Sequence, residues 1–221
     1  MAHCAHIPAF VLHQVTCQFA TGQTLFGPLS VSLEPSLCGL VGRNGVGKTR
    51  LLRLLAGLDS PAGGHIERAA AVAWVAQQPT LTPETTLATL LGYASVFAAL
   101  SRLEQGQGLA DDFDLLDGHW DLTDRLSLAF READLPPFSA DRPAFSLSGG
   151  ERMKALLCGA FVSGADYLLL DEPTNYLDRQ GREWLYHQLE SWQGGALIAS
   201  HDRELLTRMP RIIELTPTAL R

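Results

Sequence analysis

The hydrophobic positions of the chain fall into short runs that predict a sheet. Strict alternation of apolar and polar residues at 29–33 predicts a half-buried antiparallel strand. Continuous runs rich in apolar and branched residues, typical of strands, occur at residues 10–19, 37–41, 71–75, 167–171, 196–199 and 211–215. Helical spacing follows several of them, at residues 50–57, 182–185 and 204–206. The pattern predicts an α/β core with a mostly parallel sheet and an N-terminal antiparallel β-subdomain.

The middle of the chain differs from both flanks because its pattern is helical but irregular. Residues 82–84, Thr-Pro-Glu, predict a helix start with a capping hydroxyl, Pro at the first position and an early acid. The acidic run 111–114 does not fit a calcium loop, so we expect a solvated loop there. We therefore expect a single domain, residues 1–221, in which a helical subdomain at about 80–145 is inserted between core parts 1–79 and 146–221.

Composition narrows the class of protein. The 221 residues are 46% hydrophobic and 19% charged, which is ordinary for a soluble globular domain. No apolar run approaches the roughly 18 residues of a membrane span, and the start lacks the form of a signal peptide, so we expect a cytoplasmic protein. The net charge of −7 gives no general footprint for nucleic acid. The four cysteines show no C-x-x-C spacing, which predicts reduced thiols.

The first candidate for chemistry is a glycine-rich loop that follows the predicted strand 37–41 and opens a helix. It fits the pattern G-x-x-x-x-G-K-[ST], in which glycines let backbone N–H groups surround phosphates. The residues expected to hold a nucleoside triphosphate are Gly42, Arg43, Asn44, Gly45, Gly47, Lys48 and Thr49. Lys48 would contact the outer phosphates, and the Thr49 hydroxyl would ligate Mg2+. The alternative is a Gly-rich turn with an incidental Lys, but the chain has only one other lysine, Lys154.

Two acids end the wholly apolar strand 167–171. Ligands gather beyond the carboxyl ends of parallel strands, so Asp171 and Glu172 should lie beside the phosphate loop. Asp171 can hold Mg2+, and Glu172 can orient or deprotonate the water that attacks the γ-phosphate. The alternative is an acidic pair that starts a turn before Pro173.

A third candidate is the segment 147–151, Leu-Ser-Gly-Gly-Glu. Ser148 and Glu151 form the pattern of a capping box at a helix start. Capping does not explain Gly149 and Gly150, because each glycine costs a helix up to ~1 kcal/mol relative to Ala. We expect an anion to approach this bare backbone, and it would be a nucleotide held by another domain.

Taken together, these motifs resemble an ATP-binding cassette (ABC) nucleotide-binding domain over nearly the whole length. Residues 42–49 resemble the Walker A loop of this P-loop NTPase family, and residues 168–172 resemble Walker B with its catalytic Glu. Residues 147–151 match the LSGGE signature, and 175–178 resemble the D-loop. Gln77 resembles the Q-loop glutamine.

Two more residues take roles from the same resemblance. His201 corresponds to the switch histidine, and Phe19 falls where the family places an aromatic ring to stack on adenine. Each role has a simpler alternative. Phe19 and Gln77 could be ordinary strand or turn residues, and His201 could be a polar residue that precedes a short helix. The resemblance implies that ATP, Mg2+ and the attacking water are held by Walker A together with Gln77, Asp171, Glu172 and His201. It also implies that Ser148, Gly149 and Gly150 of a second ABC domain close over the γ-phosphate.

Within the family, the segments 172–178 and 200–204 resemble the ABC-F branch of soluble two-cassette proteins, many of which act at the ribosome. Tyr176 departs from that branch, which usually has His at this position. Residues 211–217 resemble the end of the first cassette of such a protein. The second domain would then come in trans, as a homodimer, or in cis, from a longer chain.

Three functions share this machinery. An ABC-F-like ATPase would act on the ribosome or translation, although net acidity counts mildly against contact with RNA. An ATP-binding subunit of a membrane transporter would dock on a permease. A scaffold would use nucleotide only for dimerisation, and Glu172 with His201 counts against that. The first function is the prediction, and the permease subunit is its alternative.

Overall fold

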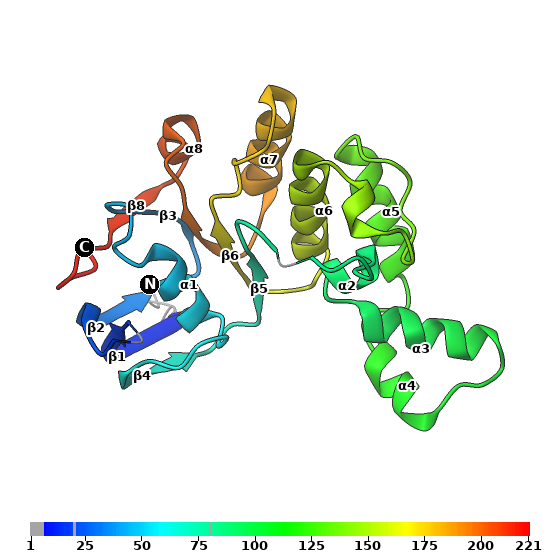
Figure 1. Cartoon of the computed structure of the whole chain (residues 1–221), viewed down its shortest axis with the longest axis horizontal. Coiled ribbons are helices and arrows are strands. Elements are labelled where there is room, and N and C mark those ends of the chain that lie inside the picture. Colours follow the sequence, from blue (N-terminus) through cyan, green and yellow to red (C-terminus); the bar gives the residue numbers. More distant parts are fainter. Residues whose placement is uncertain (1–6, 20, 80) are drawn as a thin grey trace, which may run out of the picture. The chain divides into compact units, whose positions relative to one another are not determined.

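The computed structural model describes residues 7–19, 21–79 and 81–221 (Figure 1). Its contacts divide the chain into two compact units. The first comprises Met1–Gln77, Gly164–Thr174 and Leu185–Arg221, and the second comprises Gln78–Ser163 and Asn175–Trp184. The second unit therefore includes the helix that begins with the signature segment, which the expected boundary near residue 145 assigns to the core.

Three antiparallel strands form one sheet of the first unit, in the order β2-β1-β4. Their bounds are Phe10–Gln18 for β1, Thr24–Leu33 for β2 and Gly63–Arg68 for β4. Leu12 and Val15 of β1 point into the core, whereas His13 between them is partly exposed. This confirms the N-terminal antiparallel subdomain, but β4 was not predicted because it begins with two Gly residues and has Ile66 as its single apolar side chain.

Five parallel strands form the second sheet, in the order β5-β6-β7-β3-β8. Their bounds are Leu37–Val41 for β3, Val72–Val75 for β5, Tyr167–Asp171 for β6, Gly195–Ala199 for β7 and Arg211–Glu214 for β8. Every residue of β6 and β7 is buried, which explains why their sequences are apolar without alternation. The predicted mostly parallel α/β core is confirmed. Because all five strands run the same way, the loops that follow them emerge at one edge.

The helices of the first unit are α1, Lys48–Leu55, α8, Arg203–Thr207, and the end of α7, Arg179–Ser191. Leu51, Leu52, Leu54 and Leu55 of α1 are buried in the same apolar cluster as Leu169 of β6. Cys17, Cys38 and Cys158 are buried free thiols, as expected, and Cys4 lies outside the described residues.

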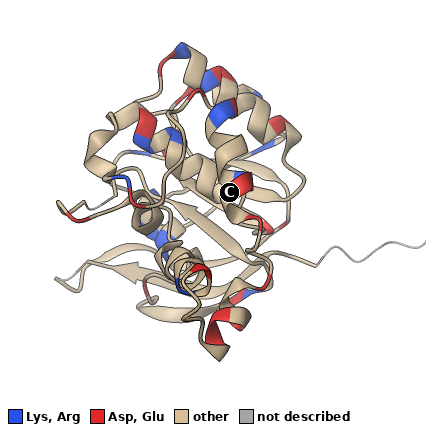
Figure 2. Cartoon of the chain, turned by 90° about the vertical axis from the view of Figure 1, so that its right-hand side faces the viewer, with Lys and Arg blue, Asp and Glu red and all other residues tan. Residues whose placement is uncertain are grey.

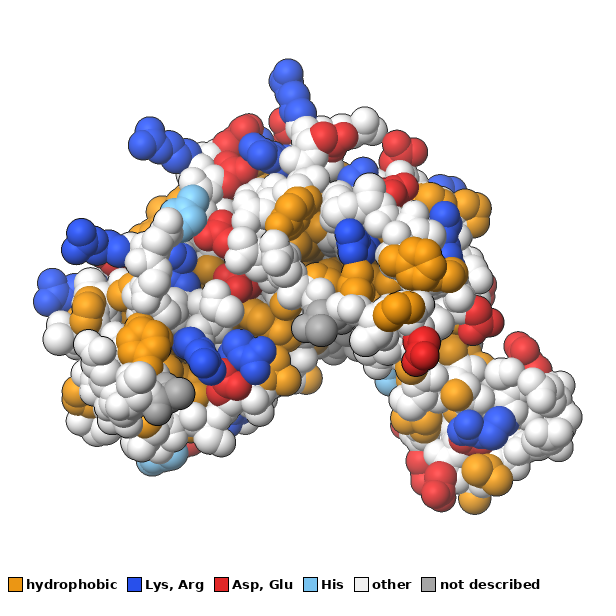
Figure 3. Space-filling model, viewed as in Figure 1, with side chains coloured by type: hydrophobic (Ala, Val, Ile, Leu, Met, Phe, Trp, Pro, Cys, Tyr) orange, Lys and Arg blue, Asp and Glu red, His pale blue; other side chains and the backbone are white. Residues whose placement is uncertain are grey.

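The second unit is helical, as predicted. Its elements are α2, Leu87–Leu90, α3, Ala94–Glu104, α4, Ala110–Leu116, α5, Leu122–Glu132, a 3-10 turn at Ala144–Ser146, α6, Gly149–Phe161, and the start of α7. Leu126, Phe130 and Cys158 lie in its apolar core. Hydrophobic side chains also reach the surface over α3 and α4, among them Phe113, which is 54% exposed (Figure 3). None of the described helices is long and apolar enough to cross a membrane.

Two local predictions were wrong in this unit. The helix expected at residue 82 begins at Leu87, because the Thr85 hydroxyl accepts a hydrogen bond from the Thr82 backbone N–H at 2.9 Å and closes a turn instead. The acidic run 111–114 is not a loop but part of α4. Asp112 within it is buried, where it pairs with the Arg102 guanidinium and accepts a hydrogen bond from the Leu109 backbone N–H.

Candidate active site

The phosphate-loop residues 42–49 connect β3 to α1 in a conformation that requires glycine. Gly47 has φ of 106°, and a Cβ there would lie 2.8 Å from side-chain atoms of Leu25 and Phe26. At Gly42 a Cβ would lie 2.6 Å from the Leu215 carbonyl oxygen. Arg43, Asn44 and Gly45 are exposed at the tip of the loop. The base of the loop thus packs against β2 and Leu215. Its tip is open to solvent.

Lys48 lies at the start of α1 and is only 9% exposed. Its Nζ donates a hydrogen bond to the Gly42 carbonyl oxygen at 3.0 Å and lies 3.3 Å from Nε2 of His201. The loop therefore holds the ammonium group of Lys48 through its own carbonyl oxygen. The same group faces His201, which lies between β7 and α8.

The next residue joins the loop to Walker B. The Thr49 hydroxyl donates a hydrogen bond to Oδ2 of Asp171 at 2.8 Å. Asp171 ends β6 and is 3% exposed, and burial raises the pKa of its carboxyl, which the Thr49 hydrogen bond and the Lys48 charge partly offset. A hydroxyl and a carboxylate oxygen at this distance are hard oxygen donors, the type of ligand that Mg2+ takes in proteins. The donor set therefore fits the Mg2+ expected from the sequence.

Glu172 and His201 contact each other through two pairs of atoms. Oε2 of Glu172 accepts a hydrogen bond from the His201 backbone N–H at 3.2 Å, and Oε1 lies 3.4 Å from His201 Nε2. The backbone of Glu172 is left-handed, with φ of 49°, and its N–H donates to the Ala199 carbonyl oxygen. Burial raises the pKa of the Glu172 carboxyl, and the nearby His201 lowers it in part. The pKa of this carboxyl is therefore closer to neutral pH than that of an exposed glutamate.

One ring nitrogen of His201 faces both a cation and a carboxylate. Nε2 can accept a hydrogen bond from Lys48 only when it carries no proton, and it can donate to Glu172 only when it carries one. The two contacts therefore exclude each other for any single protonation state of the ring. Nε2 of His201 thus lies between Lys48 and Glu172 and can hydrogen-bond to only one of them at a time.

Sequence reasoning missed two residues that fix the start of α8, directly after His201. Asp202 caps α8 by accepting hydrogen bonds from the backbone N–H groups of Glu204 at 2.9 Å and Leu205 at 3.2 Å. Its other carboxylate oxygen accepts a hydrogen bond from the Tyr186 hydroxyl at 3.1 Å. The N-cap pattern before α8 was the available signal for Asp202, whereas Tyr186 comes from α7 and carries no local signal.

Two predicted residues lie outside this hydrogen-bonded cluster. Gln77 follows β5 at the same edge of the parallel sheet, since β5 pairs with β6. Among the described residues, the hydrogen bonds and ion pairs of the cluster join Lys48 to His201 and His201 to Glu172, and they do not include Gln77. Phe19 lies just after β1 and is 48% exposed. Stacking of Phe19 on a base stays a prediction.

The signature segment belongs to the second unit. The predicted capping box is present: the Ser148 hydroxyl accepts from the Glu151 backbone N–H at 3.2 Å, and Oε2 of Glu151 accepts from the Ser148 backbone N–H at 2.7 Å. The structure gives Gly150 a reason that the sequence did not, because a Cβ there would lie 2.8 Å from the Tyr176 carbonyl oxygen. The ring of Tyr176 lies against Gly149, and its hydroxyl accepts a hydrogen bond from Gln78.

Comparisons with known proteins show which family the chain is similar to. A family profile described as ABC transporter matches residues 27–175. The energy-dependent translational throttle protein EttA of Mycobacterium tuberculosis is 34% identical over 232 residues, which cover 96% of this chain and 39% of that protein. The ATP-binding protein Uup of Caulobacter vibrioides is 36% identical over 214 residues, covering 95% and 30%. The chain thus spans less than half the length of these curated relatives.

Solved structures show the same fold at lower identity. The dimeric structure of a bacterial ABC transporter cassette is 18% identical, with a TM-score of 0.72, and the match covers 96% of both chains. The structure of an ATP-binding subunit of an ABC transporter is 20% identical, also with a TM-score of 0.72, covering 96% of this chain and 88% of that one.

Proposed function

The chain belongs to the ABC transporter family, whose cassettes are ATPases, and from this premise we propose that it binds ATP with Mg2+ and hydrolyses the γ-phosphate at a site completed by a second cassette. The observation that supports this most is the contact set of the first unit. A phosphate-loop lysine, a Thr–Asp oxygen pair and a Glu–His pair all meet at one edge of the parallel sheet.

The residues of this edge divide into those that hold phosphate and metal and those that act on water. Lys48 and the loop around it would hold the β- and γ-phosphates. Thr49 and Asp171 would ligate Mg2+ directly or through water, with Gln77 as a further ligand. The metal would neutralise charge that develops on the phosphate oxygens.

Glu172 is the proposed general base. Its raised pKa brings it closer to the pH of the cell, which favours transfer of a proton from the attacking water. The His201 backbone N–H fixes one carboxylate oxygen of Glu172, and the ring opposes the other. When Lys48 turns from His201 to a bound phosphate, Nε2 of His201 would be free to contact the γ-phosphate or Glu172. Phe19 would stack on the adenine.

The second cassette supplies the other side of the pocket. Ser148, Gly149 and Gly150 begin α6, and the start of a helix favours an anion. We place this helix start over the γ-phosphate of a partner cassette, either another copy of the chain or a second cassette of a longer protein. A dimeric solved cassette of this fold and the greater length of the relatives support this arrangement.

Action on the ribosome or translation, in the cytoplasm, is the finer part of the proposal. It is supported by similarity to EttA, named a translational throttle protein, and by the ABC-F-like segments around Glu172 and His201. Acidic and basic residues are mixed along the helices (Figure 2), so contact with RNA would depend on particular side chains and not on a basic face. The alternative is an ATP-binding subunit docked on a permease, supported by the family match.

The test of hydrolysis is a single substitution. Glu172→Gln keeps the size and hydrogen-bonding reach of the side chain but removes the base, so we expect ATP binding to persist and turnover to fall by at least about 100-fold. Binding is measured by calorimetry and turnover by phosphate release. Glu104→Gln, on the exposed side of α3, is the matched control and should leave both unchanged. Wild-type turnover in Glu172→Gln would refute the role of Glu172.

The test of the ribosome is co-sedimentation with the same variant. Glu172→Gln with ATP should accumulate the closed, bound form, so we expect it to pellet with ribosomes more than wild type does. Recovery of the variant only in the supernatant at low and at physiological salt would favour the permease alternative.

A further inference from the structure

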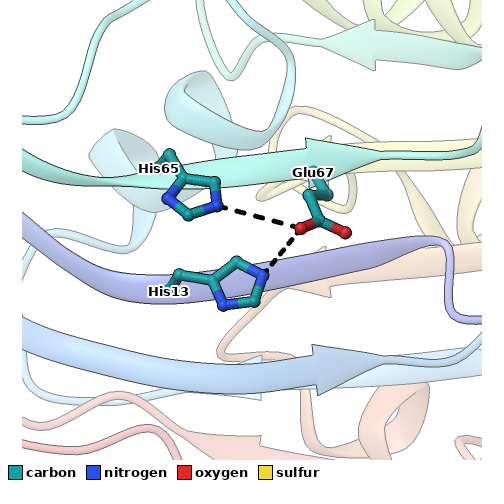
Figure 4. A group of neighbouring side chains, drawn as sticks. All are labelled: His13, His65 and Glu67. Carbon is teal, nitrogen blue, oxygen red and sulfur yellow. Dashed lines mark hydrogen bonds and ion pairs between the residues drawn. The ribbon is translucent and has the colours of Figure 1, made fainter.

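Three side chains able to bind a metal lie together on the antiparallel sheet, among residues that the proposed hydrolysis does not use. His13 is on β1, and His65 and Glu67 are on β4 (Figure 4). His13 is directly opposite His65 in the strand register. His65 and Glu67 are two residues apart, so they share one face of β4. The pairing of the two strands thus brings all three side chains to the same face of the sheet.

The distances suit one metal ion. Nε2 of His13 lies 3.0 Å from Oε1 of Glu67, and Nε2 of His65 lies 3.8 Å from the same oxygen. All three ligand atoms lie within 4.8 Å of one another. Ligands of a tetrahedral zinc ion, with bonds of about 2.0–2.1 Å, are separated by roughly 3.3 Å. Side-chain rotation alone, without a change in the strands, would therefore bring the three atoms to ligand spacing.

A β-bulge fixes the backbone under this cluster. The register of β1 and β4 shifts between His13 and Thr16, and Gln14 within the shift is left-handed, with φ of 50°. On the opposite strand Gly64 has φ of 78°, and a Cβ there would lie 2.2 Å from the His13 carbonyl oxygen. Bulges change the direction of side chains at the edge of regular pairing. Here the bulge sets the point at which the two histidine rings face each other.

The rings are stacked, with centroids 4.4 Å apart and an interplanar angle of 13°. The side chains of His13, Glu67 and His65 are 43%, 63% and 66% exposed, so solvent reaches them directly. Two imidazoles and one carboxylate select borderline divalent ions such as Zn2+, Co2+, Ni2+ and Cu2+ over Mg2+ and Ca2+, which prefer oxygen ligands alone. Three protein ligands leave at least one coordination position for water or an outside donor.

We propose that His13, His65 and Glu67 form a binding site for a divalent transition metal ion, Zn2+ above all, on the exposed face of the three-stranded sheet. The ion links β1 to β4, two strands that are separated in sequence by β2, β3 and α1. Because the ligands are brought together only when the strands pair, the metal binds the folded state and stabilises it.

The test is titration of the nucleotide-free full chain with Zn2+ by calorimetry, with Mg2+ in excess to occupy oxygen-ligand sites. His3, Cys4 and His6 lie outside the described residues, so all proteins carry His3→Ala, Cys4→Ser and His6→Ala. We expect one Zn2+ per chain. His13→Ala and His65→Ala should each weaken binding by at least about tenfold, and Glu67→Gln should also weaken it.

His187→Ala is the matched control, because His187 is an exposed histidine that lies 3.7 Å from a single glutamate, Glu190. It should leave Zn2+ binding unchanged. Saturating Zn2+ should raise the Tm by about 5 °C at a hundred times Kd, and this rise should disappear in His13→Ala/His65→Ala. Both histidines are partly exposed, so the variants are expected to fold, which the Tm without metal verifies. Unchanged affinity in the double variant, or equal loss in His187→Ala, would overturn the proposal.

Discussion

At the residue scale, the partly buried carboxylate of Glu172 shows a conflict between function and stability. Burial raises the pKa of Glu172, so its charged form is less stable in the folded protein than in the unfolded chain. Because this pKa is raised on folding, Glu172 contributes most to stability at pH values below its unfolded pKa, near 4.3. That contribution is lost as the pH rises through the folded-state pKa. The ionised glutamate therefore destabilises the fold at neutral pH.

This predicts that Glu172→Gln is more stable than wild type at pH 7, because it removes a partly buried charge. The difference should shrink as the pH falls towards 4, where the wild-type carboxyl is also neutral. Thermal unfolding followed by circular dichroism between pH 4 and 8 measures it, with Glu104→Gln as the control. A stability difference that does not change with pH would show that packing, not charge, is responsible.

At the scale of elements, α1 is fixed at both ends. Its first residues, Lys48 and Thr49, belong to the site, and Arg53 near its end forms a two-pronged ion pair with Asp59, at 2.8 Å for both contacts. Arg50 adds a third hydrogen bond at 3.0 Å. Mainly through Arg53, these contacts lower the pKa of Asp59 to about 2. The turn after α1 thus holds the helix that begins with Lys48.

Asp59→Asn should therefore destabilise the first unit by on the order of 1 kcal/mol at pH 7, a value that allows for solvent screening of a partly exposed pair. Because the pKa of Asp59 is lowered on folding, this stabilisation is fully present at pH values above the unfolded pKa of 3.8 and is lost as the pH falls towards 2. Urea unfolding at pH 7 and pH 3 measures the effect, and Asp111→Asn, at an exposed acid of α4, is the control. An equal loss at both pH values would contradict the ion-pair explanation.

The elements also show what a sequence can predict. The strands β6 and β7 were predictable because burial on both faces leaves a continuous apolar run. The start of α2 and the position of Asp112 were not, because a Thr–Thr turn and an Arg102 partner ten residues away decide them. The loop 42–49 between a strand and a helix, and the position of Asp171 at the end of β6, follow from local patterns and could be predicted.

Contacts that depend on tertiary placement were missed, both at the candidate active site and on the antiparallel sheet. Tyr186 reaches Asp202 from another helix, and the His13–His65 pair exists only through the register of β1 with β4. The latter also required β4 itself, whose sequence lacks the apolar pattern of a strand. The sequence explains Gly150 only through an approaching anion, whereas the backbone of Tyr176 also requires a glycine there. Such contacts have no period or spacing in the sequence.

At the scale of the whole molecule, the proposed hydrolysis site has two sources. The chain that binds the nucleotide supplies one side, and a second cassette supplies the other. The first unit carries the phosphate loop, Asp171 and Glu172, and the second carries the signature at the start of α6. Complementation can decide whether the signature acts on a neighbouring chain. Lys48→Ala disables the phosphate loop, and Ser148→Arg places a bulky cation at the exposed signature serine. Each variant alone should be inactive.

A mixed dimer of Lys48→Ala and Ser148→Arg chains contains one intact site and one doubly altered site. Random pairing makes half of the dimers mixed, so a one-to-one mixture should recover about a quarter of wild-type turnover if the sites act independently. Phosphate release measures the recovery, and crosslinking verifies the dimers. Because Ser148→Arg also removes a helix cap worth about 1 kcal/mol, its Tm must be compared with that of wild type. An inactive mixture with confirmed, folded dimers would mean that each chain closes over its own nucleotide.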